Sequence, residues 1–564
     1  MLQSVDIVVF LVYFVIVASY GLWIYYRKKK ESETSTDFFL AKGSLTWWAI
    51  GASLIASNIS AEQFIGMSGS GFKLGLAISA YEWLGAAALI IVAVFFMPIY
   101  LKNRIFTMPQ FLKTRYNETV ALIMAIFWLF LYITVNLTSI LYLGTLAINN
   151  LTGGENFHLI MAGLAIFAMI ITLGGMKVIG YTDVIQVLVL VIGGLVTSYI
   201  ALQLVSEHLG FGADIFAGFK ALLNEAPGHF DMIFDKPTAS STKEQVSNYL
   251  DLPGVAMLIA GMWVANLNYW GCNQYITQRA LGADLQTART GILFAAFIKL
   301  MMPLIVVLPG IAAYVLHKNG ALQTEMLTEG EFRSDNAYSA ILGFLPAGLK
   351  GLSLAALTAA IVASLAGKAN SVSTIYTLDI YRKYINKDAP EKKLVWMGRV
   401  VVLVSLLLAV IVNWRDALGI GSEGGFIFIQ KYTGYISPAI FAVFLLGFFW
   451  KKTTSKAAIA GIISGLFLMV LFDKFLAGWS QENFLYTAFM NAQGVYEIPF
   501  LVSMGWVFFF TILIMVIISL LDTKGRKQVN ALEVDTRMYR VSPSVLTMII
   551  VLTGILLALY IRFW

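Results

Sequence analysis

Apolar stretches of roughly 20 residues recur along the whole chain, and a helix of that length matches the hydrocarbon thickness of a bilayer. Of the 564 residues, 59% are hydrophobic and only 13% are charged, which is not the composition of a soluble domain. The longest polar stretch, residues 206–249, is too short for a large soluble catalytic domain. We therefore expect an all-α polytopic membrane protein embedded in a lipid bilayer.

These stretches predict 14 transmembrane helices. Their ranges are 5–26, 46–69, 77–101, 119–148, 156–175, 180–205, 250–273, 287–316, 352–381, 394–414, 424–449, 455–471, 499–521 and 543–563. The first has no basic residue before it and Arg27-Lys28-Lys29-Lys30 after it, the reverse of a cleaved signal peptide. With the N-terminus outside, the cytoplasmic loops hold 25 Lys and Arg residues and the external loops hold 9. The positive-inside rule therefore predicts a multi-pass protein of the cell (inner) membrane with both termini outside.

The composition also excludes several kinds of function. The single cysteine, Cys272, excludes a disulfide framework and a cysteine-based metal site. The net charge of +7 comes from short loops beside apolar runs, so it indicates topology and not a nucleic-acid partner. A GxGxxG pattern at 419–424 has no strand before it and does not predict a dinucleotide site. The sequence indicates no enzyme activity and no obligate protein partner.

Three ionisable side chains interrupt the apolar stretches: Glu82, Lys299 and Lys368. A charge inside a bilayer costs a few kcal/mol or more, so it normally faces a protein interior or a wet cavity and marks a transport pathway. Neither a nucleophile nor a metal cluster accompanies Glu82, which argues against a membrane enzyme. The chain is expected to move something polar across the membrane.

Two predicted helices contain polar residues at mid-membrane depth, at 57–60 (Ser-Asn-Ile-Ser) and at 266–268 (Asn-Leu-Asn). Asn and Ser compete for backbone hydrogen bonds, so we expect both helices to be interrupted there, although single Asn-containing kinks are ordinary in membrane bundles. A matched pair indicates two five-helix units of opposite orientation, with a solute site at the midplane. The predicted division is 1–45 (extra helix and loop), 46–205 (first repeat), 206–249 (external loop), 250–449 (second, inverted repeat) and 450–564 (three C-terminal helices).

The segment from Ala52 to Met67, ASLIASNISAEQFIGM, resembles the sodium:solute symporter family, and within it the sodium/galactose (sodium/glucose-type) branch. Further similar blocks follow in order along the whole chain. They are Tyr81-Glu-Trp83, Tyr181 to Gln186, Trp263 to Trp270, Lys299, Ala359 to Ser364, Phe426 to Gly434 and Gly447 to Lys456. The resemblance implies a LeuT-like core and sodium-driven uptake of a sugar by alternating access.

A hexose needs several fixed hydrogen-bonding groups and an aromatic platform. The resemblance implies sugar ligands at Asn58, Gln63, Glu82, Asn266, Lys299 and Gln430. It also implies an inner-gate ring at Tyr269 and an outer gate at Met67, Tyr81 and Phe426. For Glu82 and Lys299 a purely structural ion pair is the main alternative, and for the amides it is interhelical hydrogen bonding. Gly85 and Asn268 depart from the serine and tyrosine of the galactose branch, so the particular sugar stays open, and another polyol or a carboxylated sugar is the alternative substrate.

For sodium, which is transported and is not a prosthetic group, the resemblance implies the carbonyls of Ala56, Ile59 and Ala360 and the hydroxyl of Ser364. Hard oxygens of this kind suit a small cation. It also implies Asp183 on the ion's exit path. Ala363 stands where the family usually has a second hydroxyl, so the site lacks one ligand.

Lys368 lies one helical turn after Ser364, on the same face. Three interpretations stay open. The lysine extends toward the cytoplasmic surface, it pairs with Asp183 as a latch on the exit path, or it stands in for the cation and makes transport sodium-independent or proton-coupled.

Overall fold

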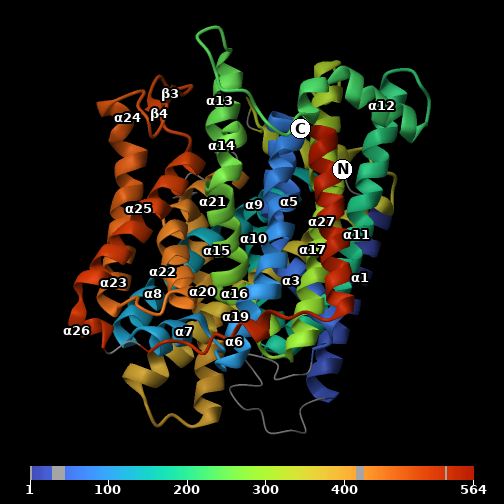
Figure 1. Cartoon of the computed structure of the whole chain (residues 1–564). Helices are drawn as coiled ribbons and strands as arrows, with labels where there is room; N and C mark the ends of the chain where they lie inside the picture. Colours follow the sequence, from blue (N-terminus) through green and yellow to red (C-terminus); the bar gives the residue numbers. More distant parts are fainter. Residues whose placement is uncertain (1–2, 28–44, 174, 329, 415–424, 528–529) are drawn as a thin grey trace. The chain divides into compact units, whose positions relative to one another are not determined.

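The computed structural model describes residues 3–27, 45–173, 175–328, 330–414, 425–527 and 530–564. Within them the chain is almost entirely helical, with two short antiparallel hairpins (Figure 1). This confirms the expected all-α class. The basic run at 28–30 and the GxGxxG pattern at 419–424 lie outside the described residues.

The chain forms two compact units, each made of three separate stretches. Unit 1 comprises residues 1–79, 127–230 and 278–429, and unit 2 comprises 80–126, 231–277 and 430–564. Helices α8 (Glu118–Leu131), α16 (Gln274–Leu281) and α21 (Gly425–Gly434) each contain one of the five boundaries between these stretches.

Unit 1 is built on long helices. Its elements are α1 (Ser4–Arg27), α3 (Trp47–Asn58), η1 (Glu62–Met67), α4 (Ser68–Leu74), η2 (Gly75–Ser79), η4 (Tyr132–Leu137), α9 (Thr138–Leu151), α10 (Phe157–Thr172), α11 (Gly175–His208), α12 (Ile215–Glu225), η5 (Pro227–Phe230), α17 (Leu285–Lys318), β1 (Leu327–Thr328), β2 (Glu331–Phe332), η6 (Ser334–Asn336), α18 (Ala337–Gly343), α19 (Leu349–Thr374), η7 (Ile375–Ile385) and α20 (Glu391–Asn413).

In the core of unit 1, α11 packs against α3, α17 and α19, and α3 packs against α17 and α19. Small residues let these backbones approach, as is usual for helices in membranes. A Cβ on Gly51 of α3 would lie 2.7 Å from the carbonyl oxygen of Gly291 of α17, and a Cβ on Gly291 would lie 2.8 Å from that of Trp47. The glycines therefore hold α3, which carries the first predicted interruption, directly against α17.

Unit 2 contains shorter elements. They are α5 (Ala80–Ile91), η3 (Val92–Phe96), α6 (Met97–Lys102), α7 (Met108–Arg115), α13 (Lys243–Asp251), α14 (Gly254–Ile259), α15 (Gly261–Cys272), α22 (Ser437–Phe449), α23 (Ser455–Lys474), α24 (Leu476–Trp479), β3 (Phe489–Met490), β4 (Tyr496–Glu497), α25 (Phe500–Leu521), α26 (Thr523–Arg526), η8 (Thr536–Tyr539) and α27 (Pro543–Phe563).

In unit 2, α15 packs on α5, α22 and α25. The buried Arg115 at the end of α7 donates three hydrogen bonds, at 2.9–3.1 Å, to the carbonyls of Gly447, Trp450 and Thr453. These carbonyls lie at and just after the C-terminus of α22, where backbone oxygens have no helical donor. One guanidinium therefore caps that helix end.

Ten helices among the described residues are long and apolar enough to cross a membrane, and the number rises to twelve when each of two bent helix pairs is counted as one span. Apolar side chains of α1 and α27 are widely exposed, as on helices that face lipid. The chain is an all-helical multi-pass membrane protein.

Candidate functional site

The first predicted interruption lies where the sequence places it, in unit 1. Helix α3 ends at Asn58, and Ile59 has an extended backbone (φ −79°, ψ 113°). Helical structure resumes in the π-helical turn η1 at Glu62. π-helical turns are rare overall, but those that occur often lie at functional sites. The residues of the break are all buried, so its backbone groups lie away from water.

The side chains of Ser60 and Gln63 accept hydrogen bonds from backbone N–H groups at this break. The N–H of Ser60 donates to the side-chain oxygen of Gln63 (3.2 Å), and the N–H of Glu62 donates to the hydroxyl of Ser60 (3.2 Å). The bond to Gln63 is one half of a capping box, in which a Gln three residues after a Ser accepts from the backbone N–H of that Ser. The side-chain oxygen of Gln63, a predicted sugar ligand, therefore also holds the break open.

Two of the carbonyls predicted to bind sodium, those of Ala56 and Ile59, lose their helical hydrogen-bond donors where α3 ends. In a continuous helix the N–H of Ser60 would bond to the carbonyl of Ala56, and that of Gln63 to the carbonyl of Ile59. Instead, Ser60 donates to the Gln63 side chain and the N–H of Gln63 donates to the carbonyl of Ser60 (3.1 Å). The oxygens of Ala56 and Ile59 are therefore available to a cation.

Helix α19 packs against α3 and brings Ser364 to the break. The Ser364 hydroxyl donates to the carbonyl of Ser57 at 3.0 Å. Ala360 lies one turn earlier on α19 and is also buried. The predicted sodium ligands thus belong to two packed helices of unit 1, and carbonyl and hydroxyl oxygens are the donor types that a hard cation takes.

Lys368 lies beside this cluster. Its ammonium is 3.4 Å from the hydroxyl oxygen of Ser364 and 3.7 Å from Oε1 of Glu62. The side chain is 1% exposed, so it does not extend to the surface. The interpretation that Lys368 extends toward the cytoplasmic surface was therefore wrong, because Glu62, on the turn after the break, supplies a buried counter-charge.

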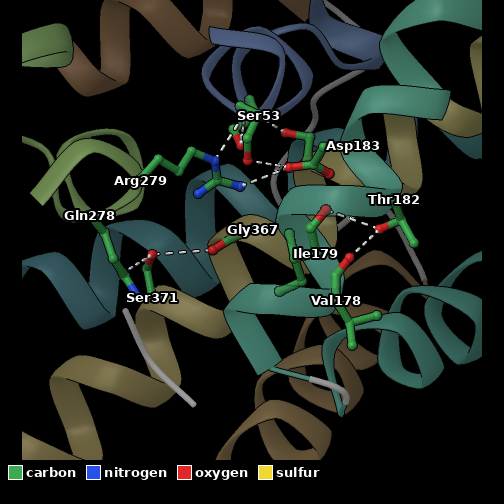
Figure 2. Close-up of polar contacts among 11 residues, drawn as sticks. Ser53, Val178, Ile179, Thr182, Asp183, Gln278, Arg279, Gly367 and Ser371 are labelled. Atoms are coloured by element: carbon green, nitrogen blue, oxygen red, sulfur yellow. Dashed lines mark hydrogen bonds and ion pairs between the residues drawn. The ribbon is translucent and has the colours of Figure 1, made fainter. Parts of the chain in front are cut away.

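The predicted pairing of Lys368 with Asp183 is also wrong. Asp183 of α11 accepts a hydrogen bond of 2.5 Å from Ser53 and lies 3.7 Å from Nη2 of Arg279. Figure 2 shows the Arg279 guanidinium reaching toward both Ser53 and Asp183, and its Nε donates to the Ser53 carbonyl at 2.9 Å. The aspartate is 1% exposed and its charge is compensated by the arginine.

Arg279 fits beside α19 because residue 367 is a glycine. A Cβ at Gly367 would lie 2.6 Å from Nη2 of Arg279. One turn further, the Ser371 hydroxyl oxygen lies 3.1 Å from both the side-chain oxygen of Gln278 and the carbonyl oxygen of Gly367, as Figure 2 also shows, and its one proton is shared between them. Ser364, Lys368 and Ser371 follow at helical spacing, so α19 carries one continuous polar face.

Two predicted sugar ligands of unit 1 meet at the break. The ammonium of Lys299, on α17, donates to the side-chain oxygen of Asn58 at 2.6 Å, and both residues are buried. The predicted outer-gate residues Met67 and Phe426 are buried as well. A Cβ on Gly66 would lie 2.7 Å from the backbone nitrogen of Phe426, so α21 begins in direct contact with η1.

The second interruption lies in unit 2, and its predicted position was wrong. The helical segment Lys243–Ile259 and helix α15 meet at an angle of 80°, and the break is at Ala260 (φ −142°, ψ −56°). Asn266 and Asn268 lie inside the regular helix α15. The amide of Asn266 donates to the carbonyl of Met262 one turn back (3.0 Å), and that of Asn268 donates to Ser437 (3.0 Å), so neither disrupts the helix.

The remaining predicted sugar ligands and gate residues also belong to unit 2. Tyr81 and Glu82 are buried on α5, which packs on α15. Tyr269 of α15 packs edge-on against the rings of Trp270 and Tyr275. Gln430 is half-buried on α21.

Sequence reasoning singled out neither Glu62 nor Arg279 for a role. A buried lysine requires a negative partner, and Glu62 was the nearest carboxylate to the predicted break; that requirement was the available signal. Arg279 had no comparable signal, because its burial depends on Gly367 and on the fold.

Comparison with known proteins gives a consistent result. A model of the sodium:solute symporter family matches residues 38–465. The sodium/glucose cotransporter of Vibrio parahaemolyticus is 43% identical, with 100% of this chain and 99% of that protein covered. The human sodium/myo-inositol cotransporter 2 is 34% identical, covering 83% and 69% respectively. A solved structure of a Na+-coupled sialic acid symporter is similar in fold, with a TM-score of 0.74, 20% identity, and coverage of 92% of this chain and 98% of that one.

Proposed function

Because this chain belongs to the sodium:solute symporter family, we propose that it couples the inward movement of sodium to the uptake of a monosaccharide of the galactose/glucose type. The full-length similarity to a sodium/glucose cotransporter supports both the ion and the class of solute. A symport function also accounts for the buried charged side chains, and it requires no covalent chemistry.

The observation that carries the coupling is the position of Asn58. It is the last residue of α3, between the two carbonyls that have lost their helical donors, and its side chain holds the ammonium of Lys299. A sodium ion bound by Ala56, Ile59, Ala360 and Ser364 would fix this turn. The ion would thereby orient Asn58 for a sugar hydroxyl, so ion binding precedes and favours sugar binding.

The proposed sugar ligands follow the resemblance. They are Asn58, Gln63, Glu82, Asn266, Lys299 and Gln430, with Tyr269 as the stacking ring. Met67, Tyr81 and Phe426 act as the outer gate, and Asp183 lies on the path by which sodium leaves. The sodium gradient and the membrane potential, about 2.3 kcal/mol per charge for each 100 mV, drive the cycle.

We further propose fourteen spans in a LeuT-like arrangement of two inverted five-helix repeats, 46–205 and 250–449, in the inner membrane with both termini outside. Two observations support a number above twelve. Helix α4 ends at Leu74, and the next residue, Gly75, has a positive φ of 66° that turns the chain before α5, although 62–102 forms one long helical stretch. Helix α10 is apolar and, with 16 residues, only slightly shorter than a typical span.

Uptake of radiolabelled galactose and glucose into proteoliposomes tests the function. An inward sodium gradient is expected to drive accumulation, whereas equal potassium or proton gradients are not. Uptake that is equally fast without sodium would refute the coupling. Unlabelled myo-inositol belongs among the competitors, because a myo-inositol cotransporter is 34% identical and Gly85 departs from the galactose pattern.

A further inference from the structure

We infer that Lys368 is a tethered cation that competes with the transported sodium ion for Ser364, and that Glu62 sets the strength of this competition. The inference rests on the proposed function, because it concerns the sodium site of that mechanism. It assigns a role in ion specificity to Lys368 and Glu62.

The first step is the orientation of the Ser364 hydroxyl. Its proton is donated to the carbonyl of Ser57 at 3.0 Å, so only its lone pairs remain for a cation. The ammonium of Lys368 lies 3.4 Å from the same oxygen. Sodium needs these lone pairs too, because Ala363 offers no second hydroxyl. Lys368 and the sodium ion therefore compete for the same ligand, the hydroxyl oxygen of Ser364.

The second step is charge. Lys368 is 1% exposed and the Glu62 side chain is 10% exposed, so water screens neither of them strongly. Two positive charges a few ångströms apart repel each other strongly where water does not screen them. A sodium ion at Ser364 therefore requires Glu62 to draw the ammonium away. The carboxylate lies 3.7 Å from the ammonium, and Glu62 is the first residue of η1, directly after the break.

The third step is the balance of the site. With both residues present, the pair is neutral and sodium must displace the ammonium from Ser364. Without the lysine, the remaining Glu62 carboxylate attracts sodium. Without the carboxylate, the lysine charge opposes sodium and stays at Ser364. The two single substitutions should therefore change the sodium affinity in opposite directions.

Equilibrium binding of ²²Na⁺ to the purified full-length protein, without sugar, measures this directly. Relative to the native chain, Lys368→Met is expected to bind sodium roughly tenfold tighter and Glu62→Gln roughly tenfold weaker. The double variant Glu62→Gln/Lys368→Met should return close to the native affinity. Lys368→Gln repeats the test with a polar replacement where Lys368→Met does not fold.

Lys383→Met is the matched control. Lys383 lies on η7, the continuation of α19, and also forms an ion pair with a carboxylate one turn away, Asp379 at 2.6 Å. Its loss should leave sodium binding unchanged. Unchanged or weaker binding by both Lys368 variants, or weakening by both Lys368→Met and Glu62→Gln, would overturn the inference. Sodium-driven uptake by the native protein would then leave the proposed function intact, whereas no sodium binding by any variant would overturn both.

Discussion

The two helix interruptions differ in what causes them. After Asn58 the break is built from local side chains: Ser60 and Gln63 satisfy the backbone groups that the broken helix leaves open. At Ala260 the break is a consequence of packing. A Cβ on the next residue, Gly261, would lie 2.0 Å from the carbonyl oxygen of Leu501 on α25.

This difference shows which sequence features predict a break in a buried helix. An asparagine alone does not, because Asn266 donates to its own helix. A serine followed three residues later by glutamine does, because it replaces the lost hydrogen bonds. The break after Asn58 removes the helical donors of the Ala56 and Ile59 carbonyls. The break at Ala260 turns the chain by 80°.

The largest expected effect concerns the packing-driven break. Gly261→Ala places its methyl group against a backbone oxygen that cannot move cheaply, so we expect a loss of about 3 kcal/mol in stability. The thermal stability of the purified variant, followed by its elution as a monodisperse peak after heating, measures this. Gly163→Ala on α10 is the control, since its Cβ would meet nothing within 4 Å. Equal stability of Gly261→Ala and the native chain would mean that Leu501 does not enforce the break.

A smaller effect is expected at the locally built break. Gln63→Ala removes the acceptor of the Ser60 N–H, which costs about 1–2 kcal/mol as for other helix caps. It should also weaken ²²Na⁺ binding, because Ala56 and Ile59 would no longer be held in place. Gln63→Glu keeps an acceptor oxygen at this position and should retain the fold. Native sodium affinity in Gln63→Ala would show that the cap formed by Gln63 is not needed to hold Ala56 and Ile59 in place.

The limits of prediction from sequence follow the same division. The helical class and the break after Asn58 could be predicted, because apolar length and local capping residues encode them. The position of the second break could not, since it depends on Leu501, more than two hundred residues away. Likewise, Asp183 pairs with Arg279 and not with Lys368, because Gly367 opens a space that no local pattern shows. The predicted sodium and sugar ligands rest on the family resemblance and await measurement.

Gly367→Ala sharpens the comparison on the ion side. Its methyl group would lie 2.6 Å from Nη2 of Arg279, at the flexible end of a side chain, so the arginine can shift at a cost of about 1 kcal/mol. The shift would weaken the contact with Asp183, and the rate of sodium-driven sugar uptake is expected to fall several-fold while the protein stays folded. Native uptake with native stability would show that Arg279 does not act on the exit path.

The smallest effect on folding is expected for Asn266→Ala. Alanine favours a helix, and the carbonyl of Met262 loses only a second donor, so stability should change by less than about 1 kcal/mol. Sugar affinity should nevertheless fall roughly tenfold if the amide is a ligand, since a buried sugar hydroxyl would lose its partner. A binding curve from tryptophan fluorescence measures this. An unchanged curve would remove Asn266 from the sugar ligands.

The cap formed by Arg115 has a consequence for how the orientation of this chain in the membrane is encoded. Because the Arg115 guanidinium donates to three backbone carbonyls, the fold requires this residue whichever side of the membrane it faces. The charges that are free to interact with lipid head groups near this helix end are instead the exposed lysines that follow it, Lys451 and Lys452. Selection for insertion direction can therefore act on those two positions independently of selection for the packing of α22.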